Sequence, residues 1–508
     1  MNSSTLSIGL LVLVMITTMA AADPGPSFSA LPVRLRQQIR DMVEPPPTHE
    51  RNGCYSTPMY YGMFEGFEYN GALDKDPDKR FYQKGSPGPD FGTWRLDRNR
   101  LDWQEAMIRD WAELGLNNTH LNIYPVDGSL EITESYRVWL EGFVRLSRKY
   151  GLKIGVRLDA LGAYEAWPMN PDNPDNVIDE YLAYATEIAS LLKGQTAYYV
   201  LGDELTLHEP KPDLDVKKWT PDRYLRYFKR VCGAIKRIEP EAKVSMFAAS
   251  SGEWFNILYL LKNGYADVGD GVAINHYSYQ AAPKFFADAA ALAPNLMFLS
   301  NGVGYVSTAT AEPRFPQNDP YSRHGTEQSQ ATSIAKNMFA WWDLRADTAP
   351  YYITLRNWVI RGKVYPRWFG FFGIEDYVID EHDRLTVHRH PGWYAYQTIT
   401  HTFYNRDDFR EAPFEITADP APSMMRSYVH EVPGGSELVM MLWHDKPMKS
   451  TVKIAADRYR YAVRPDLFNY RKWTDVPYSL ESDAVTMDLA LDPNPTIIRL
   501  VATEASRP

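Results

Sequence analysis

Hydrophobic residues recur along this chain with two different periods. Short apolar runs such as residues 197–201 are typical of strands buried on both faces of a parallel sheet. Between these runs lie longer segments in which apolar residues stand three and four positions apart. Tyr136, Leu140 and Phe143 show this spacing, which predicts one buried helical face. Strands that alternate with helices in this way indicate an α/β fold.

The alternation continues through most of the chain. The predicted strands cover residues 60–67, 118–125, 152–160, 197–201, 242–250, 271–279, 296–304 and 349–358. The predicted helices cover 102–115, 175–193, 253–264, 283–293, 327–347 and 391–403, together with one that ends at Gly151 and one that begins at Thr220 and Pro221. Eight strand–helix units over about 350 residues predict a (β/α)8 TIM barrel. A doubly wound open sheet would need a glycine-rich phosphate turn after its first strand, and the sequence has none there.

Changes in pattern divide the chain into four predicted segments. Residues 1–22 carry a short apolar stretch followed by small residues, which is typical of a secretory signal peptide, although no positive charge follows Met1. An N-terminal extension and linker covers 23–52, and the catalytic barrel covers 53–408. Residues 412–503 contain short alternating runs separated by Pro, Gly and Asp, which predict an antiparallel β-sandwich. We therefore expect a secreted or periplasmic protein with no membrane span.

Composition narrows the range of partners. The net charge of −10 comes without a basic stripe, which argues against a general nucleic-acid binder. The 14 tryptophans and 33 tyrosines offer aromatic faces of the kind that stack on sugar rings. The two cysteines, Cys54 and Cys232, are interpreted as ordinary thiols. Without a CxxC motif or paired histidines, we expect no metal and no cofactor, and the sequence leaves the oligomeric state open.

Polar side chains gather where the predicted strands end, which is the active-site face of a barrel. Asp203 and Glu204 follow the apolar run 197–201 and Gly202, and they are the predicted catalytic pair. The side chains predicted to bind the substrate at the same face are Glu65, Tyr124, Asp159, Asn275, His276, Tyr277, Asn301 and Trp358. Acids, amides, a histidine and aromatic rings on one face are typical of a site for carbohydrate, whereas phosphate sites show glycine loops and more cations.

Three features together carry a resemblance to a known family. The sequence LGDE follows one strand, INHYSY follows a later strand, and a β-sandwich comes last. This order resembles the barrel glycoside hydrolases of clan A, which carry an acid/base glutamate after strand four and a nucleophilic glutamate after strand seven. The resemblance implies that Glu204 protonates the leaving oxygen of a glycosidic bond. It also implies that His276 and Tyr277 lie beside the cleaved sugar.

The chain departs from that family at two positions. Clan A enzymes usually have asparagine before the acid/base glutamate, and this chain has Asp203. Asn301 stands where the strand-seven nucleophile is expected, and without a carboxylate the usual covalent intermediate cannot form. The adjacent Asp and Glu are similar to the hexosaminidases of family 20, in which the substrate's own 2-acetamido oxygen attacks the anomeric carbon. That similarity implies that Asp203 orients the acetamido group.

Other interpretations of the same residues stay open. An inverting glycosidase would need a remote carboxylate, such as Asp159, Glu65 or Glu68, to activate water. A degenerate barrel would bind glycans without cleaving them. In purely structural interpretations, Glu204 forms a salt bridge with an arginine such as Arg157 or Arg356, and its aspartate neighbour caps a turn.

Overall fold

The chain is described from a computed structural model. It describes residues 23–44, 81–83, 94–96, 100–123, 125, 129–158, 169–170, 172–203, 205–211, 214, 218–249, 254–275, 282–302, 327–344, 355–366, 373–404, 408–432, 434–456, 458–481 and 483–503. The predicted signal peptide, residues 1–22, and the predicted first strand, residues 60–67, lie outside this part of the chain, so both stay predictions.

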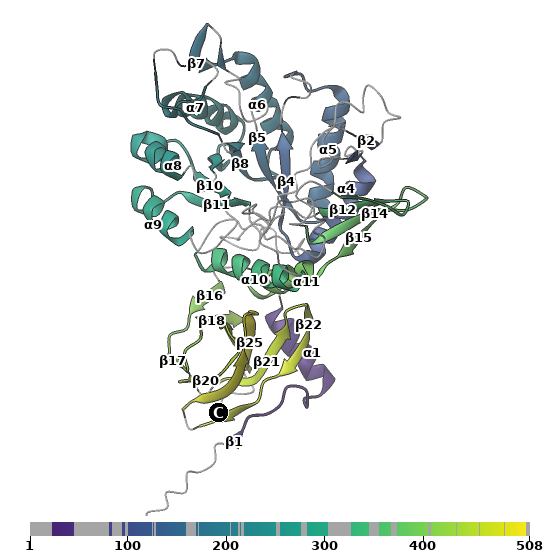
Figure 1. Cartoon of the computed structure of the whole chain (residues 1–508), viewed down its shortest axis with the longest axis vertical. Helices are drawn as coiled ribbons and strands as arrows, with labels where there is room; N and C mark the ends of the chain where they lie inside the picture. Colours follow the sequence, from purple (N-terminus) through teal and green to yellow (C-terminus); the bar gives the residue numbers. More distant parts are fainter. Residues whose placement is uncertain are drawn as a thin grey trace, which may run out of the picture.

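Six strands form one parallel sheet whose spatial order follows the order of the chain. They are β4 (Asn118–Ile123), β5 (Lys153–Leu158), β8 (Thr196–Asp203), β9 (Val244–Ala249), β10 (Gly271–Asn275) and β11 (Met297–Gly302). The helices that precede or follow them are α4 (Leu101–Leu114), α5 (Glu134–Lys149), α6 (Asp179–Leu192), α7 (Pro221–Ile238), α8 (Trp254–Leu260) with the π-turn η2 (Leu261–Tyr265), α9 (Ala282–Leu292) and α10 (Glu327–Asp343). Figure 1 shows these helices around the outside of the strands. The predicted α/β fold of barrel type is confirmed.

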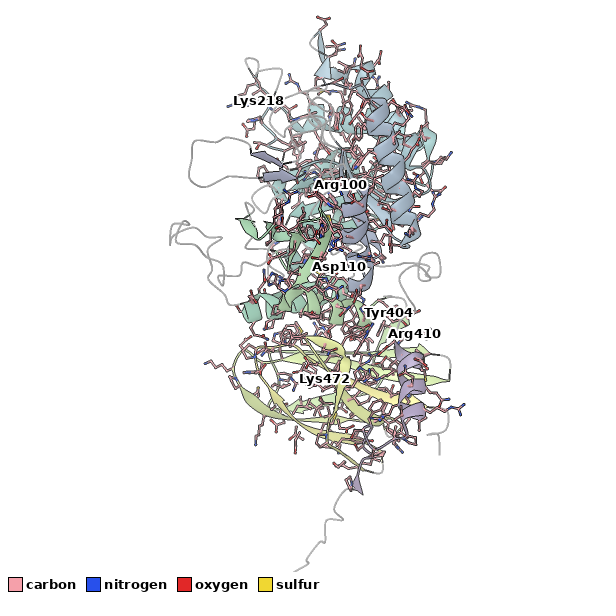
Figure 2. All side chains as sticks on the ribbon, turned by 90° about the vertical axis from the view of Figure 1, so that its right-hand side faces the viewer. Arg100, Asp110, Lys218, Tyr404, Arg410 and Lys472 are labelled. Atoms are coloured by element: carbon pink, nitrogen blue, oxygen red, sulfur yellow. The ribbon has the colours of Figure 1, made fainter. Side chains whose placement is uncertain are left out.

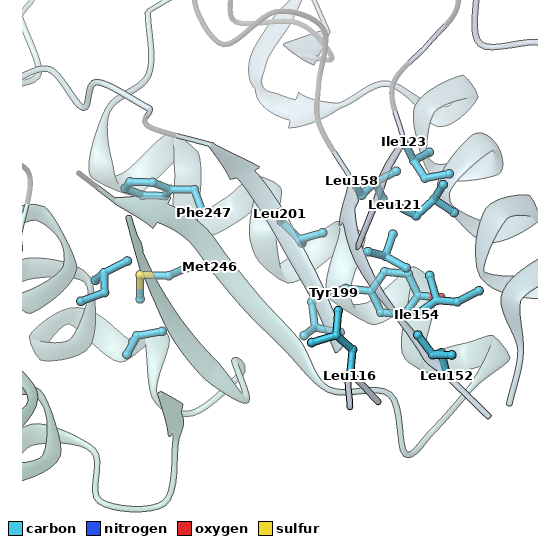
Figure 3. Packing of buried hydrophobic residues seen from close by; sticks show 14 of the residues in the cluster. Leu116, Leu121, Ile123, Leu152, Ile154, Leu158, Tyr199, Leu201, Met246 and Phe247 are labelled. Carbon is cyan, nitrogen blue, oxygen red and sulfur yellow. The ribbon is translucent and has the colours of Figure 1, made fainter. Parts of the chain in front are cut away.

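Each strand of the parallel sheet has two buried faces. One face packs against the helices, and Leu121, Ile154 and Leu201 belong to this helix-facing core (Figure 3). The other face forms a separate inner cluster of Ala197, Tyr198, Val200, Ala248, Ala273 and Leu299. Where both faces are apolar, as in β8, the strand appears in the sequence as a continuous hydrophobic run rather than as an alternating one.

Local signals set the helix starts, and one predicted start is wrong. Thr220 caps α7 by accepting a hydrogen bond from the backbone N–H of Arg223, as the sequence predicts. The segment predicted as a helix from residue 175 instead contains β7 (Asn173–Val177), which pairs with β6 (Met169–Asn170). The residues NPDNV favour extended and turn conformations, so α6 begins only at residue 179. No described helix has the length and apolar character that crossing a membrane requires.

A second, smaller sheet follows the parallel one. It consists of β13 (Lys363–Pro366), β12 (Leu355–Ile360), β14 (Glu375–Ile379) and β15 (Leu385–Arg389) in that spatial order. β12 runs parallel to β14 and antiparallel to β13. It continues two residues beyond the end predicted at residue 358, because a turn at residues 361 and 362 leads it directly into β13. α11 (Pro391–Thr402) follows this side sheet.

The C-terminal part is the predicted antiparallel β-sandwich, with one sheet ordered β1-β23-β24-β20-β17 and the other β16-β18-β19-β25-β21-β22. The strands are β1 (Asp23–Pro24), β16 (Phe409–Glu411), β17 (Ile416–Asp419), β18 (Met424–Val432), β19 (Gly435–Trp443), β20 (Met448–Ile454), β21 (Arg460–Asp466), β22 (Asn469–Asp475), β23 (Tyr478–Leu480), β24 (Val485–Leu491) and β25 (Thr496–Thr503). An isolated pair, β2 (Phe81–Gln83) and β3 (Trp94–Leu96), lies earlier in the chain. Leu438, Met440, Leu500 and Val452 belong to the core between the two sheets.

The described part of the N-terminal segment packs on the sandwich. β1 pairs with β23, and α1 (Val33–Val43) places Ile39 and Val43 in one buried cluster with Val501. Nη2 of Arg499 donates to the carbonyl of Val43 at 2.9 Å and also pairs with the fully buried Glu437. Burial alone would raise the pKa of Glu437, but the guanidinium of Arg499 holds it below its usual range. A buried ion pair thus holds the end of α1 against the sheet.

The barrel and the sandwich share one apolar core. Val439 and Met441 on β19 belong to the same core as Phe339 on α10. Figure 2 places Tyr404 at this junction, where its hydroxyl lies 3.2 Å from Nε2 of His430. Because side chains of both parts fill a continuous interior, the sandwich is packed against the barrel rather than tethered to it.

A buried carboxyl group lies between the side sheet and α4. Glu375, the first residue of β14, is fully buried, and its Oε1 accepts hydrogen bonds from the hydroxyl of Tyr377 at 2.7 Å and from Nε1 of Trp111 at 3.1 Å. Burial raises the pKa of Glu375 well above its usual range, and the carboxylate of Asp110 acts in the same direction. Asp110 accepts a hydrogen bond from Nε of Arg389 at 2.8 Å. The fold therefore favours a neutral Glu375.

This burial predicts a pH-dependent stability. Because the folded-state pKa of Glu375 lies above the unfolded value, its contribution to stability is complete below about pH 4 and is lost as the pH rises through the folded-state pKa. Glutamine keeps the Oε1 acceptor and cannot ionise. Between pH 4 and pH 8 we therefore expect the free energy of unfolding of Glu375→Gln to rise relative to that of the wild type. Urea unfolding measures it, with the exposed Glu381→Gln as control, and a difference independent of pH would contradict the prediction.

Candidate active site

Two opposite charges meet at the carboxyl ends of the parallel strands. Asp203 is the last residue of β8, and Arg157 is next to last in the neighbouring β5. Nη1 of Arg157 donates to Oδ2 of Asp203 at 2.7 Å, and the two side chains are only 14 % and 23 % exposed. The ion pair fixes the Asp203 carboxylate at the edge where a barrel carries its active site.

Gly202 turns Asp203 toward the inner face of the sheet. Leu201 faces the helices, so strict alternation along the strand would turn Asp203 the same way. Gly202 has a φ of +103°, and a Cβ there would lie 3.0 Å from Cδ1 of Leu205 and 3.2 Å from Cβ of Phe247, both in the helix-facing core. Residues 201 and 202 therefore both face the helices. The regular alternation of side chains between the two faces of the strand is shifted by one residue from this point on. This places Asp203 on the inner side with Arg157.

The neighbouring strand β9 contains a matching irregularity. Met246 and Phe247 both belong to the helix-facing core, whereas Ala248 belongs to the inner cluster. Ala248 is the register partner of Asp203, so β8 and β9 change phase together. The pairing of β9 with β10 shifts at the same place. The inward position of Asp203 thus depends on a change of phase that involves β8, β9 and β10.

Polar side chains of β4 extend the site from Arg157. Asn122 is the register partner of Arg157, and its Oδ1 lies 3.1 Å from Nε2 of His120. His120 is fully buried, which lowers its pKa to about 3, and the positive charge of Arg157 acts in the same direction. His120 is therefore a neutral hydrogen-bonding group at physiological pH, and Arg157 supplies the positive charge beside Asp203.

The chain is anchored on both sides of residue 204. Asp203 is held by Arg157, and Leu205 is 4 % exposed within the helix-facing core. Leu207 is also buried, and the backbone N–H of His208 donates to the carbonyl of residue 219 at 2.7 Å. The loop after β8 therefore leaves the sheet in a defined direction.

The other predicted site residues fall into three groups. Glu65, Tyr124, Asp159, Glu204, His276 and Tyr277 lie outside the described residues. For Asn275 and Asn301 the backbone is described, and the pairing of β10 with β11 brings these two strand ends side by side. Trp358 lies within β12 and pairs with Tyr365 and Tyr377 in the side sheet rather than at the edge of the six-stranded sheet.

Sequence reasoning missed part of this arrangement. It considers Arg157 as a partner of Glu204, and the structure pairs Arg157 with Asp203. His120 and Asn122 are not among the predicted site residues. The sequence does contain a sign of them: in NTHLNI the polar residues His120 and Asn122 stand two positions apart, which places both side chains on the same face of a strand. Cys232 is a buried free thiol, as predicted, and the described residues contain no cluster suited to a metal ion.

Comparisons with known proteins give matches among solved structures. The GH30 endoxylanase from Clostridium papyrosolvens is 12 % identical over 78 % of this chain and 92 % of its own, with a TM-score of 0.48. A glucosidase from Croceicoccus marinus is 11 % identical over 89 % of this chain and 98 % of its own, with a TM-score of 0.48. The GH39 enzyme from Xanthomonas axonopodis pv. citri is 12 % identical over 88 % and 96 %, with a TM-score of 0.47. No family model and no curated protein matches the sequence.

The geometry at Gly202 predicts a costly substitution. Alanine there would adopt a left-handed conformation and would also press its Cβ against Leu205 and Phe247. We expect Gly202→Ala to lower the free energy of unfolding by about 3 kcal/mol. Gly194 is the matched control, because its φ is +76° but a Cβ there would meet nothing within 4 Å, so Gly194→Ala should cost about 1 kcal/mol. Equal losses in urea unfolding would show that the close contacts at residue 202 do not matter.

Proposed function

We propose that the protein is a secreted glycoside hydrolase that cleaves O-glycosidic bonds of an oligo- or polysaccharide. The observation that carries the proposal is the inward position of Asp203 beside Arg157 at the carboxyl end of β8. The ends of β10 and β11, with Asn275 and Asn301, belong to the same edge of the sheet. A carboxylate paired with an arginine at this edge suits the hydroxyl and amide groups of a sugar. Secretion rests on the signal-peptide pattern of residues 1–22.

Glu204 is the proposed general acid and base. It follows Asp203 directly, and the residues on both sides of it are anchored. A glutamic acid in this position would protonate the oxygen of the leaving group while the anomeric carbon becomes oxocarbenium-like, and it would then accept a proton from the attacking water. This role requires no metal and no cofactor.

Cleavage assisted by a 2-acetamido group is the proposed mechanism. Asn301 lies in β11, and the resemblance to clan A expects a nucleophilic glutamate at this residue; because asparagine cannot form the covalent enzyme intermediate, the proposed nucleophile is supplied by the substrate. The acetamido oxygen of the substrate fills that role if its N–H is held. A carboxylate accepts several hydrogen bonds, so Asp203 can keep its contact with Arg157 and also accept one from the acetamido N–H.

Asn301 also favours a second candidate function, which is glycan binding without cleavage. The two functions differ in one requirement: cleavage needs a proton donor, and binding does not. Turnover and binding therefore have to be measured on the same variants.

A single substitution tests the proposed acid. We expect Glu204→Gln to reduce hydrolysis of active glycosides by about 10³-fold or more, because glutamine cannot donate the proton, while the melting temperature and glycan binding stay unchanged. Glu209→Gln is the control, because Glu209 is an exposed acid in the same loop. Activity is measured on a panel of aryl glycosides and polysaccharides, with the anomer of the product followed by proton NMR. Full activity of Glu204→Gln would remove the assignment, and binding without turnover across the panel would favour the second function.

The acetamido mechanism has its own test. Asp203→Asn should lower kcat by about 10²-fold on N-acetyl substrates, because the acetamido group loses its charged acceptor. A thiazoline that mimics the cyclised intermediate should bind the wild type and should bind Asp203→Asn more weakly. Inverted product together with no thiazoline binding would contradict the mechanism and would favour an inverting enzyme with a second carboxylate.

A further inference from the structure

A hydroxyl group is inserted between β8 and β9 beside Gly202. The hydroxyl of Tyr224 on α7 donates to the carbonyl of Leu201 at 2.9 Å and accepts from the backbone N–H of Phe247 at 2.7 Å. In a regular parallel ladder these two backbone groups pair with each other directly, because Leu201 and Met246 are register partners. Tyr224 is fully buried, and its ring centroid lies 4.9 Å from that of Phe247. Figure 3 shows Leu201 and Phe247 on the two strands concerned.

Tyr265 repeats this arrangement between β9 and β10. Its hydroxyl accepts from the backbone N–H of Met246 at 2.6 Å and donates to the carbonyl of Gly271 at 2.6 Å. Gly271 is the register partner of Ser245, so these groups too would pair directly in a regular ladder. Two successive residues of β9 therefore donate their N–H groups to tyrosine hydroxyls, one toward each neighbouring strand.

We infer that Tyr224 and Tyr265 are positioning residues for the site at the end of β8. The inference rests on the proposed function, because it concerns the orientation of the proposed catalytic pair. A strand that changes phase takes backbone N–H and C=O groups out of register, and a buried backbone group without a partner is destabilising. A tyrosine hydroxyl both donates and accepts, so each ring satisfies one group of each kind. The two hydroxyls stabilise the phase change that turns Asp203 inward.

Tyr224 acts through the backbone. It binds the carbonyl of Leu201, Gly202 follows with its positive φ, and the next residue is Asp203. Removing the hydroxyl would leave the carbonyl of Leu201 and the N–H of Phe247 without their shared partner, so that β8 and β9 move relative to each other at this point. That movement disturbs the orientation of residues 203 and 204 while the strand ends at Asn275 and Asn301 stay in place.

The phenylalanine variant tests the role, because it removes one oxygen and keeps the ring. For Tyr224→Phe we expect kcat to fall about tenfold to a hundredfold while KM changes by less than about twofold, because the catalytic pair shifts and the remaining substrate contacts persist. Tyr227→Phe is the matched control. Tyr227 lies on the same helix, is 1 % exposed, and has its hydroxyl 3.3 Å from that of Tyr181 rather than between two strands. We expect its kcat to match the wild type.

Two measurements are independent of catalysis. In Tyr224→Phe, hydrogen exchange of the Phe247 amide should accelerate about tenfold or more relative to Tyr227→Phe, and a crystal structure should show the Arg157–Asp203 pair displaced. Unchanged exchange together with an unchanged ion pair would overturn the inference. A wild type that cleaves no glycoside removes the proposed function, and these two measurements still decide the positioning role. If Tyr224→Phe does not fold, Tyr265→Phe gives the same test at the Met246 amide, with the same result overturning the inference.

Discussion

The one-residue change of phase shared by β8 and β9 is the constraint on which the site depends. Without it, Asp203 would continue the alternation of the strand and face the helices, where an ionised carboxylate among apolar side chains is strongly unfavourable. With it, the same residue faces inward and meets Arg157. Gly202 makes the change possible because its φ of +103° is open to glycine and strained for other residues. The backbone conformation of Gly202 thus allows Asp203 to face the inner side of the sheet rather than the helices.

The described charges at this edge of the sheet nearly cancel. Arg157 compensates Asp203, and the nearby His120 is neutral because burial holds its pKa at about 3. His120 therefore adds no positive charge beside Asp203. The described part of the site contains one negative and one positive group, Asp203 and Arg157, which compensate each other. A site of this kind discriminates by hydrogen bonds, which suits the hydroxyl and amide groups of a neutral sugar better than a phosphate, for which several positive groups or a glycine loop would be needed.

The sequence predicts the order of the elements well because each strand is buried on both faces and each helix shows one apolar face. It misplaces the start of α6, because the segment NPDNV pairs as the strand β7 where a helix is predicted, although its Asn, Pro and Asp residues favour extended and turn conformations. The site is less predictable. Asp203 can be placed at a strand end, but simple alternation gives no hint that Gly202 reverses its direction. The partnership with Arg157 joins residues 46 positions apart, and only the register of β5 and β8 brings them together.

The helices do more than bury one face of the sheet, because two of their tyrosine hydroxyls form hydrogen bonds with the strands near the site. Tyr224 and Phe228 on the buried face of α7 would fit an ordinary apolar helix stripe, and nothing in the spacing distinguishes the hydroxyl that reaches into the strands from the rings that only pack. Yet that hydroxyl and the one on Tyr265 are bonded to the irregular part of β9 from both sides. The position of Asp203 is therefore fixed by the tyrosines of the outer helices, by the strands and by Gly202 together. The direction of the Asp203 side chain is therefore set by buried contacts below the strand end rather than by the loop that follows it.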